Sequence, residues 1–172
     1  MLHSECAAES HSFAPFWTEK NRINQSLLET EIMTFSLYGL LTSDAQATST
    51  EDLVAQFRDL FRSYDDFSLE LAELPFTGAT ILLLRFEGWS ASVAYEYGKL
   101  VQEDSTEIQR LTSDFSKYEV SGIDRRIRVV FGNDDEEKSH TDKMVDLMTF
   151  LNEIDGILVY DPQQNDFLEK TG

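Results

Sequence analysis

The stretch 123–162 constrains the fold of this chain more than any other. Residues 126–131 alternate between apolar and mostly charged side chains, which is the period of a strand with one buried face. An apolar stripe with spacings of three and four residues follows an acidic loop and indicates a helix: Met144, Leu147, Met148, Leu151 and Ile154. Gly156 is predicted to close this helix at the C′ position. The apolar run 157–160 then predicts a strand covered on both faces, and hence a β-α-β unit with parallel strands and a right-handed crossover.

The residues before this unit predict four more strands and two helices. Apolar alternation or apolar runs predict strands over 32–41, 67–72, 81–86 and 89–95, with Glu87 and Gly88 as a hairpin turn between the last two. A helix of about four turns is expected after an N-cap at Ser49 or Thr50, and a second helix over 101–115. Ser105 or Thr106 is an alternative N-cap for the second helix.

The order of these elements is β-α-β-β-β-α-β-α-β, which predicts an α+β (mixed α/β) fold. We expect a sheet of five or six strands covered by about three helices, with the β-α-β unit at its C-terminal end. A chain of 172 residues has the usual size of one domain. We assign 32–172 to that domain and 1–31 to an N-terminal extension that is partly disordered. The tail 163–172 is expected to dock through Phe167 and Leu168.

The net charge of −18 is the unusual feature of the composition. Unstructured acidic chains are poor in aromatic residues, whereas this one contains 12 Phe, so the charge is expected on a folded surface. Such a surface repels nucleic acid and anionic lipid, and it speeds encounter with a basic protein. Solubility alone is the alternative explanation for the charge.

The cysteine content and the hydropathy predict a cytoplasmic protein without a membrane segment. Cys6 is the single cysteine, so no disulfide can form within the chain, which fits a reducing compartment. The N-terminus lacks the basic and apolar regions of a signal peptide, and no apolar run approaches the roughly 18 residues that span a bilayer.

Two acidic segments are the candidate binding residues. Asp134, Asp135, Glu136 and Glu137 lie between the strand and the helix of the β-α-β unit. Hard cations require several oxygen ligands, but this run does not match the spacing of a calcium loop, and we predict neither a metal nor a cofactor. The carboxylates either stabilise the start of the helix or form an acidic edge that faces a partner. Asp65 and Asp66 are a second acidic edge.

The remaining polar residues give no support for catalysis. The chain lacks the glycine-rich phosphate loops, the Gly-x-Ser-x-Gly turn and the His-Glu-x-x-His zinc motif, and we predict that it is not an enzyme. His140 is expected to be a solvated residue in the first turn of its helix. Arg126 and Arg128 are expected on the polar face of their strand, paired with carboxylates.

Several short segments of the second half of the chain together resemble a known class of proteins: residues 89–93, Gly98, residues 104–108, the arginine-rich strand, Asp134 and Asp135, the helix from Met144 to Leu151, and residues 159–163. They are similar to the pattern of small acidic immunity proteins, which accompany polymorphic or contact-delivered bacterial toxins. The resemblance implies stoichiometric binding and occlusion of a cognate toxin with a basic face, without catalysis or cofactor. An acidic adaptor, a nucleic-acid mimic and an enzyme of undetected type are the alternatives.

Overall fold

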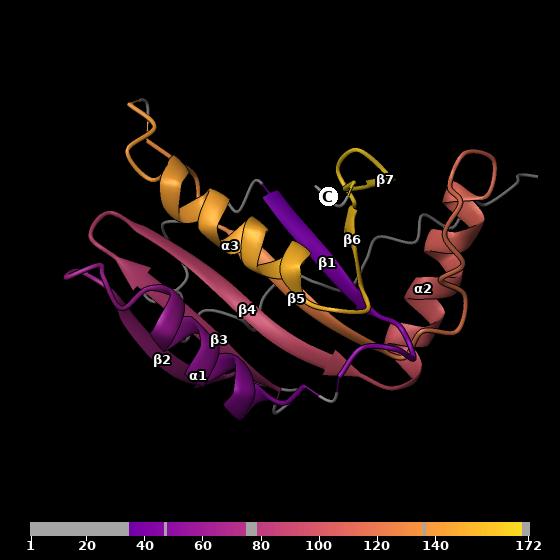
Figure 1. Cartoon of the computed structure of the whole chain (residues 1–172), viewed down its shortest axis with the longest axis horizontal. Coiled ribbons are helices and arrows are strands. Elements are labelled where there is room, and N and C mark those ends of the chain that lie inside the picture. Colours follow the sequence, from indigo (N-terminus) through magenta and orange to yellow (C-terminus); the bar gives the residue numbers. More distant parts are fainter. Residues whose placement is uncertain (1–34, 47, 75–78, 136, 170–172) are drawn as a thin grey trace, which may run out of the picture. The chain divides into compact units, whose positions relative to one another are not determined.

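A computed structural model of the chain describes residues 35–46, 48–74, 79–135 and 137–169. Within these ranges seven strands form one antiparallel sheet in the order β2-β3-β4-β5-β1-β6-β7, and three helices pack on it (Figure 1). The elements are β1 (Phe35–Leu41), α1 (Thr50–Leu60), β2 (Ser68–Glu73), β3 (Thr80–Phe86), β4 (Trp89–Tyr97), α2 (Lys99–Thr112), β5 (Arg125–Phe131), α3 (Thr141–Glu153), β6 (Ile157–Asp161) and β7 (Asp166–Phe167). The predicted α+β class is confirmed, with one strand more than expected. The N-terminal extension 1–31 lies outside the described residues.

The two strands of the predicted β-α-β unit are separated by a third strand. β1 lies between β5 and β6 and is antiparallel to both, with Leu37 opposite Val129 and Leu40 opposite Leu158. β5 and β6 therefore run in the same direction, as the crossover pattern predicts, but they are not neighbours. The sequence of β1 suits a central strand, since Leu37, Leu40 and Leu41 are all buried.

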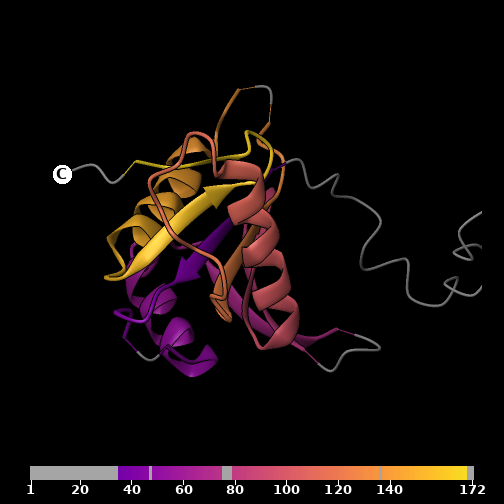
Figure 2. The same ribbon diagram turned by 90° about the vertical axis from the view of Figure 1, so that its right-hand side faces the viewer.

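The helices cover the two faces of the sheet unequally. α1 and α3 lie on one face and α2 on the other (Figure 2). The larger core lies under α1 and α3 and includes Leu53, Phe57, Leu147 and Leu151 from these helices. The smaller core on the second face joins α2 to β1, β6 and β7, and its buried residues are Leu40, Ile108, Val120, Tyr160 and Phe167.

α1 begins as expected and ends early. Ser49 is its N-cap, with a reciprocal capping box in which the Ser49 hydroxyl accepts from the backbone N–H of Asp52 and the Asp52 carboxylate accepts from the backbone N–H of Ser49. The helix has 11 residues and not four turns. Phe61 and Tyr64 continue the apolar spacing, but they follow the helix as turns and pack edge-on against Phe86. Phe61 and Tyr64 are therefore apolar because they pack against Phe86, and not because the helix continues.

α2 starts earlier than expected. Gly98, with a φ of 99°, precedes its first residue, Lys99. The alternative N-caps at Ser105 and Thr106 are therefore wrong. Ser105 is fully buried inside the helix, and its hydroxyl donates to the carbonyl of Ile123, 2.7 Å away. This bond ties α2 to the loop before β5.

Arg126 anchors the second face of the sheet. It is only 8% exposed, and its guanidinium pairs with Glu96 on β4 and with Asp104 on α2 at 2.8 Å. The guanidinium also lies over the ring of Tyr38, 4.6 Å from its centre. Arg128 pairs with Glu96 as well, so the predicted pairing of both arginines with carboxylates is confirmed. Desolvation opposes the charge of Arg126, but Glu96 and Asp104 raise its pKa.

The C-terminal segment adds the strand that the sequence pattern missed. β7 has two residues, too few to show a period, and pairs with β6 through Tyr160 and Phe167. Phe167 is buried and Leu168 partly buried, which confirms that this tail docks.

Gly156 lies two residues after the C-cap of α3, Ile154, and therefore not at the C′ position. Its φ is 73°.

We expect Gly156→Ala to destabilise the fold more than Gly98→Ala. A Cβ at Gly156 would lie 2.6 Å from the Cα of Ala45, whereas one at Gly98 would meet nothing within 4 Å. Both glycines have positive φ, so Gly98→Ala measures the backbone cost alone, about 1–2 kcal/mol. Gly156→Ala should cost about 1–3 kcal/mol more, from the clash. Urea unfolding of the two variants tests this, and equal losses would contradict it.

Candidate partner-binding site

Two acidic segments that are far apart in the sequence meet at one end of the sheet. The carboxylate of Asp66 accepts from the backbone N–H of Glu87 in the β3–β4 turn, 3.0 Å away. On the other side of this turn, Nε2 of His140 lies 3.4 Å from the position of a Cβ at Gly88, and 3.9 Å from Asp135 Oδ2. The β3–β4 turn therefore lies between the segment of Asp66 and the β5–α3 loop.

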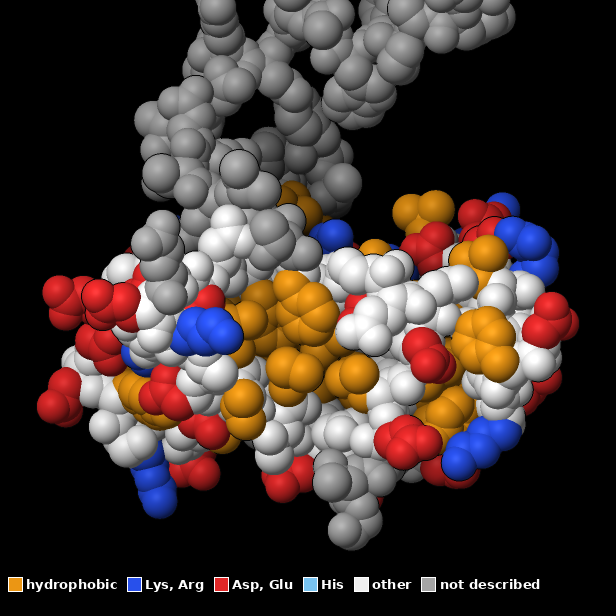
Figure 3. Space-filling view, turned by 90° about the horizontal axis from the view of Figure 1, so that it is seen from above, with side chains coloured by type: hydrophobic (Ala, Val, Ile, Leu, Met, Phe, Trp, Pro, Cys, Tyr) orange, Lys and Arg blue, Asp and Glu red, His pale blue; other side chains and the backbone are white. Residues whose placement is uncertain are grey.

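We call this region the acidic end: Asp65, Asp66, Glu87, Asp134, Asp135 and Glu137. The space-filling view shows acidic side chains at the left end of the molecule and also at the opposite end (Figure 3). Lys138 is an exposed cation in the same loop, and Arg62 nearby in sequence pairs with Asp59 at 3.1 Å. Negative charge therefore dominates this end. Glu136, which the sequence analysis also named, lies outside the described residues.

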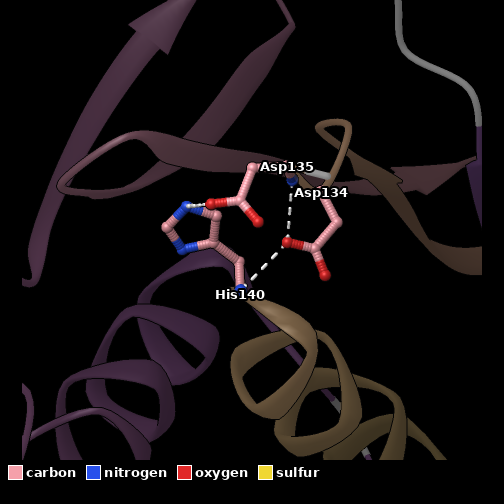
Figure 4. Close-up of side chains that lie close together, drawn as sticks. All are labelled: Asp134, Asp135 and His140. Carbon is pink, nitrogen blue, oxygen red and sulfur yellow. Dashed lines mark hydrogen bonds and ion pairs between the residues drawn. The ribbon is translucent and has the colours of Figure 1, made fainter. Parts of the chain in front are cut away.

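Asp134 and Asp135 have a local structural role (Figure 4). Asp134 accepts from the backbone N–H of His140 at 2.9 Å and from the hydroxyl of Thr141 at 2.7 Å, which ties the β5–α3 loop to the start of α3. Desolvation works to raise the pKa of Asp134, but these hydrogen bonds outweigh it and lower that pKa. Asp135 accepts from the backbone N–H of Ser139 at 2.8 Å, and this bond lowers the pKa of its carboxyl.

Three other carboxylates of the acidic end have no such role. Asp65, Glu87 and Glu137 are exposed, and their side chains make no hydrogen bond or ion pair within the described ranges. Asp66, by contrast, is exposed but caps the β3–β4 turn. The predicted acidic residues are thus of two kinds: Asp66, Asp134 and Asp135 shape the loops, and Asp65 and Glu137, with Glu87, present charge to the solvent.

His140 is not the solvated residue that the sequence predicted. It is 8% exposed and stacks on Trp89, with ring centres 6.2 Å apart and planes at 18°. Trp89 is itself fixed, because its indole N–H donates to the carbonyl of Gly132 at 3.0 Å. Sequence reasoning treated His140 as the first residue of a surface helix and did not place the hairpin over it.

Lys143 determines what His140 can do. Its ammonium group lies 3.4 Å from Nδ1 of His140 and near the rings of Tyr64 and Phe86, and Lys143 is buried. A lysine ammonium can only donate, so this contact favours the tautomer in which Nδ1 accepts and Nε2 carries the ring proton. That N–H faces the carboxylate of Asp135.

The same arrangement opposes a metal ion at this place. One ligand atom from each of Asp134, Asp135 and His140 falls within 4.8 Å of the others, which is a spacing that an ion could bridge. A histidine binds a metal through a free lone pair, usually while its other nitrogen donates to an acceptor. Here Nδ1 faces a donor and Nε2 carries the proton, so neither condition is met.

Another candidate site is a hollow at the opposite end of α3. Its volume is about 550 Å³, and its lining residues include Asp52, Phe150, Glu153 and Asp155. The described residues that line it include no histidine, cysteine, lysine or arginine. A cationic clamp for an anion, or a nucleophile activated by histidine, therefore cannot be built from them.

Comparisons of the chain with protein-family models, with curated proteins and with solved structures gave no match. Within the described ranges, none of the helices combines the length and the apolar character needed to cross a bilayer.

We expect Asp134→Ala to lower the melting temperature at pH 7, because the hydrogen bonds to His140 and Thr141 that hold the β5–α3 loop are lost. The lowered pKa of Asp134 means that its stabilising effect is complete above the unfolded pKa, near 3.8, and disappears as the pH falls through the folded value. The difference from the wild type should thus vanish in acid. Glu137→Ala, in the same loop but without these bonds, is the control and should leave the melting temperature unchanged. A difference that persists in acid would contradict this role.

We expect His140 to carry its proton on Nε2, which long-range ¹H–¹⁵N NMR spectra of the imidazole can identify. Adding Zn²⁺ should leave this tautomer and the ring resonances unchanged in the wild type. Lys143→Met removes the donor to Nδ1 but keeps Asp135 beside Nε2, and in that variant we expect the form protonated on Nδ1 to gain population relative to the wild type. A wild-type ring protonated on Nδ1 would show that Lys143 does not control it.

Proposed function

We propose that this protein is an immunity protein that binds a basic toxin through the acidic end and neutralises it by occlusion. The observation that carries the proposal is the meeting of the Asp65–Asp66 segment and the β5–α3 loop on the two sides of the β3–β4 turn. The resemblance of the second half of the chain to small acidic immunity proteins is the reason for proposing a toxin as the partner.

Charge and rigidity support this use of the acidic end. Exposed charges of one sign, gathered on one surface, attract a partner of opposite charge from a distance and increase the rate of encounter. The loops that carry them are held by Asp66, Asp134 and Asp135, so the exposed carboxylates of Asp65, Glu87 and Glu137 are presented on an ordered frame. A preorganised surface loses less conformational entropy when it binds.

The alternatives fit the geometry less well. A nucleic-acid mimic needs carboxylates spaced along an elongated face like phosphates, whereas the exposed carboxylates of the described residues are scattered over several elements, for example Glu51 on α1, Glu103 on α2 and Glu153 on α3. An enzyme needs converging reactive groups in a cavity, and the described lining of the hollow beside α3 offers carboxylates alone as ionisable groups. The acidic end requires neither a cofactor nor a reaction.

We expect the triple variant Asp65→Asn, Glu87→Gln and Glu137→Gln to bind the partner more weakly. The partner is sought as the product of the neighbouring gene, by copurification, and the affinity is then measured by calorimetry at several salt concentrations. Loss of three attractive charges should slow association several-fold and so weaken the affinity. The affinity of the variant should also depend less on salt, because salt at 0.1 M screens charges farther apart than about 10 Å and fewer charges remain to be screened.

The matched control changes three acidic residues away from the acidic end: Glu51→Gln, Glu153→Gln and Asp155→Asn. All three are exposed, and this variant has the same net charge as the first. Glu153 is the last residue of α3 and Asp155 lies two residues beyond it, whereas the acidic end lies beside the first turn of this helix. If both triple variants bind equally weakly, the net charge and not the acidic end determines the affinity, and the proposed surface is wrong. Unchanged binding by the acidic-end variant would refute it as well.

A further inference from the structure

β2 is an outer strand whose outer side pairs with no other strand of the described sheet. The strand order ends at β2, which is paired with β3 along its whole length. The opposite edge is closed differently. β7 has two residues, and the start of β1 is covered by the side chain of Gln163, which accepts from the N–H of Ser36 at 3.2 Å and donates to its hydroxyl at 3.1 Å. β2 is thus the longer open edge.

The register shows which backbone groups of β2 point outward. The backbone N–H of Leu74 donates to the carbonyl of Ala79 at 2.9 Å, so these two residues form a hydrogen-bonded pair next to the ladder. Bonded and non-bonded pairs alternate along an antiparallel ladder. Ser68, Glu70 and Ala72 therefore bond to β3, and Leu69, Leu71 and Glu73 direct N–H and C=O groups outward.

The side chains along this edge are apolar on one face and acidic at several points. Leu71 is 62% exposed, which is unusual for a leucine on an open edge. The segment 63–84 contains Asp65, Asp66, Glu70 and Glu73 and no lysine or arginine. Glu70 makes an exposed ion pair with Arg85 at 3.3 Å. The edge therefore stays negative, and it runs from the acidic end.

We propose that the partner adds an extended basic segment to β2 as an antiparallel eighth strand. This inference rests on the proposed function and specifies how the partner is held. Charge decides between the possible occupants. A second copy of this chain would bring two negative edges together, which is repulsive, whereas a basic strand is attracted. Backbone hydrogen bonds to Leu69, Leu71 and Glu73 would supply much of the binding free energy.

The pairing predicts the pattern of the added strand. Residues directly opposite each other in an antiparallel pair lie on the same face of the sheet. Those opposite Leu69 and Leu71 should be apolar, and those beside Glu70 should be lysine or arginine. The residues opposite Leu69 and Leu71 also exchange hydrogen bonds with them, so the N–H groups of the apolar residues face β2.

The probe is the peptide Lys-Val-Lys-Val-Lys with both ends capped. NMR follows the chemical shifts of the protein's backbone amides as the peptide is added. We expect shifts at the amides of Leu69, Leu71 and Glu73, and slower hydrogen exchange there on binding. N-methylation of both valines removes the N–H groups that face β2 and should weaken binding about tenfold or more. N-methylation of the lysines, whose N–H groups face away, leaves charge and composition nearly the same and should preserve binding.

A protein variant tests the same contact from the other side. Leu71→Pro removes an N–H that makes no bond within the sheet, and proline is tolerated at such edge positions. We expect this variant to keep the β2–β3 ladder and to lose about tenfold in peptide affinity. Leu71→Ile keeps the N–H and the apolar contact and should change affinity less than about threefold. If Leu71→Pro unfolds, the two methylated peptides still decide.

Equal affinity of the two methylated peptides, or shifts confined to the β5–α3 loop, would overturn the proposal. Self-association of the protein in sedimentation experiments, with slowed exchange at Leu71, would assign the edge to a second copy and overturn it as well. With the copurified partner, weaker binding by the triple acidic variant but not by Leu71→Pro would leave the acidic end as the site and refute strand addition. Peptide docking on β2 without any basic partner would support strand addition and count against the proposed function.

Discussion

The fold depends on the pairing of β1 with two strands that come much later in the chain. β1 bonds to β5 along one side and to β6 along the other, so both halves of the sequence are needed to close the centre of the sheet. Gly39 makes this packing possible, because a Cβ there would collide with the side chain of Ile157. Contacts of such long sequence separation carry a high loop-closure cost. The β5–α3 loop and the β3–β4 turn are therefore brought together only by a completed sheet.

The arginines of the second face of the sheet are used within the chain. The cluster of three arginines that the sequence contains is turned to the chain's own groups. Arg126 and Arg128 pair with Glu96, and Arg125 donates to the carbonyl of Thr42 at 3.2 Å. Burying Arg126 without these partners would be costly, since an unpaired charge loses its hydration. Because Arg126 and Arg128 are held by Glu96 and Asp104, the arginine cluster of the sequence is engaged with the chain's own carboxylates.

Much of the fold could be predicted from the sequence, because each long element has its own period. The order of the elements from β1 to β6 follows from such periods, and the capping residue Ser49 from its position before acidic residues. β7 was missed, since two residues show no period. The predicted start of α2 was wrong, because Ser105 is a buried residue inside the helix and not its N-cap. The predicted end of α1 was wrong, because Phe61 and Tyr64 keep helical spacing although they lie outside the helix.

The candidate site was predictable in composition but not in arrangement. Charge density identified Asp65, Asp66, Asp134 and Asp135, yet no local pattern says that the two segments share one turn. That depends on the β3–β4 hairpin, which also covers His140 and so changes its environment. The alternation in β2 predicted the strand, but whether it is an edge is a property of the whole sheet order, which pairs β1 with β5 and leaves β2 outermost.

The charges along β2 serve two physical purposes. An open edge with an exposed leucine is a site for uncontrolled pairing, and charged side chains on such an edge oppose association between identical copies. The repulsion depends on the sign of the neighbour, however. A strand that carries lysine or arginine meets attraction at the positions where a second copy meets repulsion, at Glu70 and Glu73. Under the proposed strand addition, the same carboxylates that oppose pairing of this chain with itself would favour a basic strand, because the sign of the neighbour decides between repulsion and attraction.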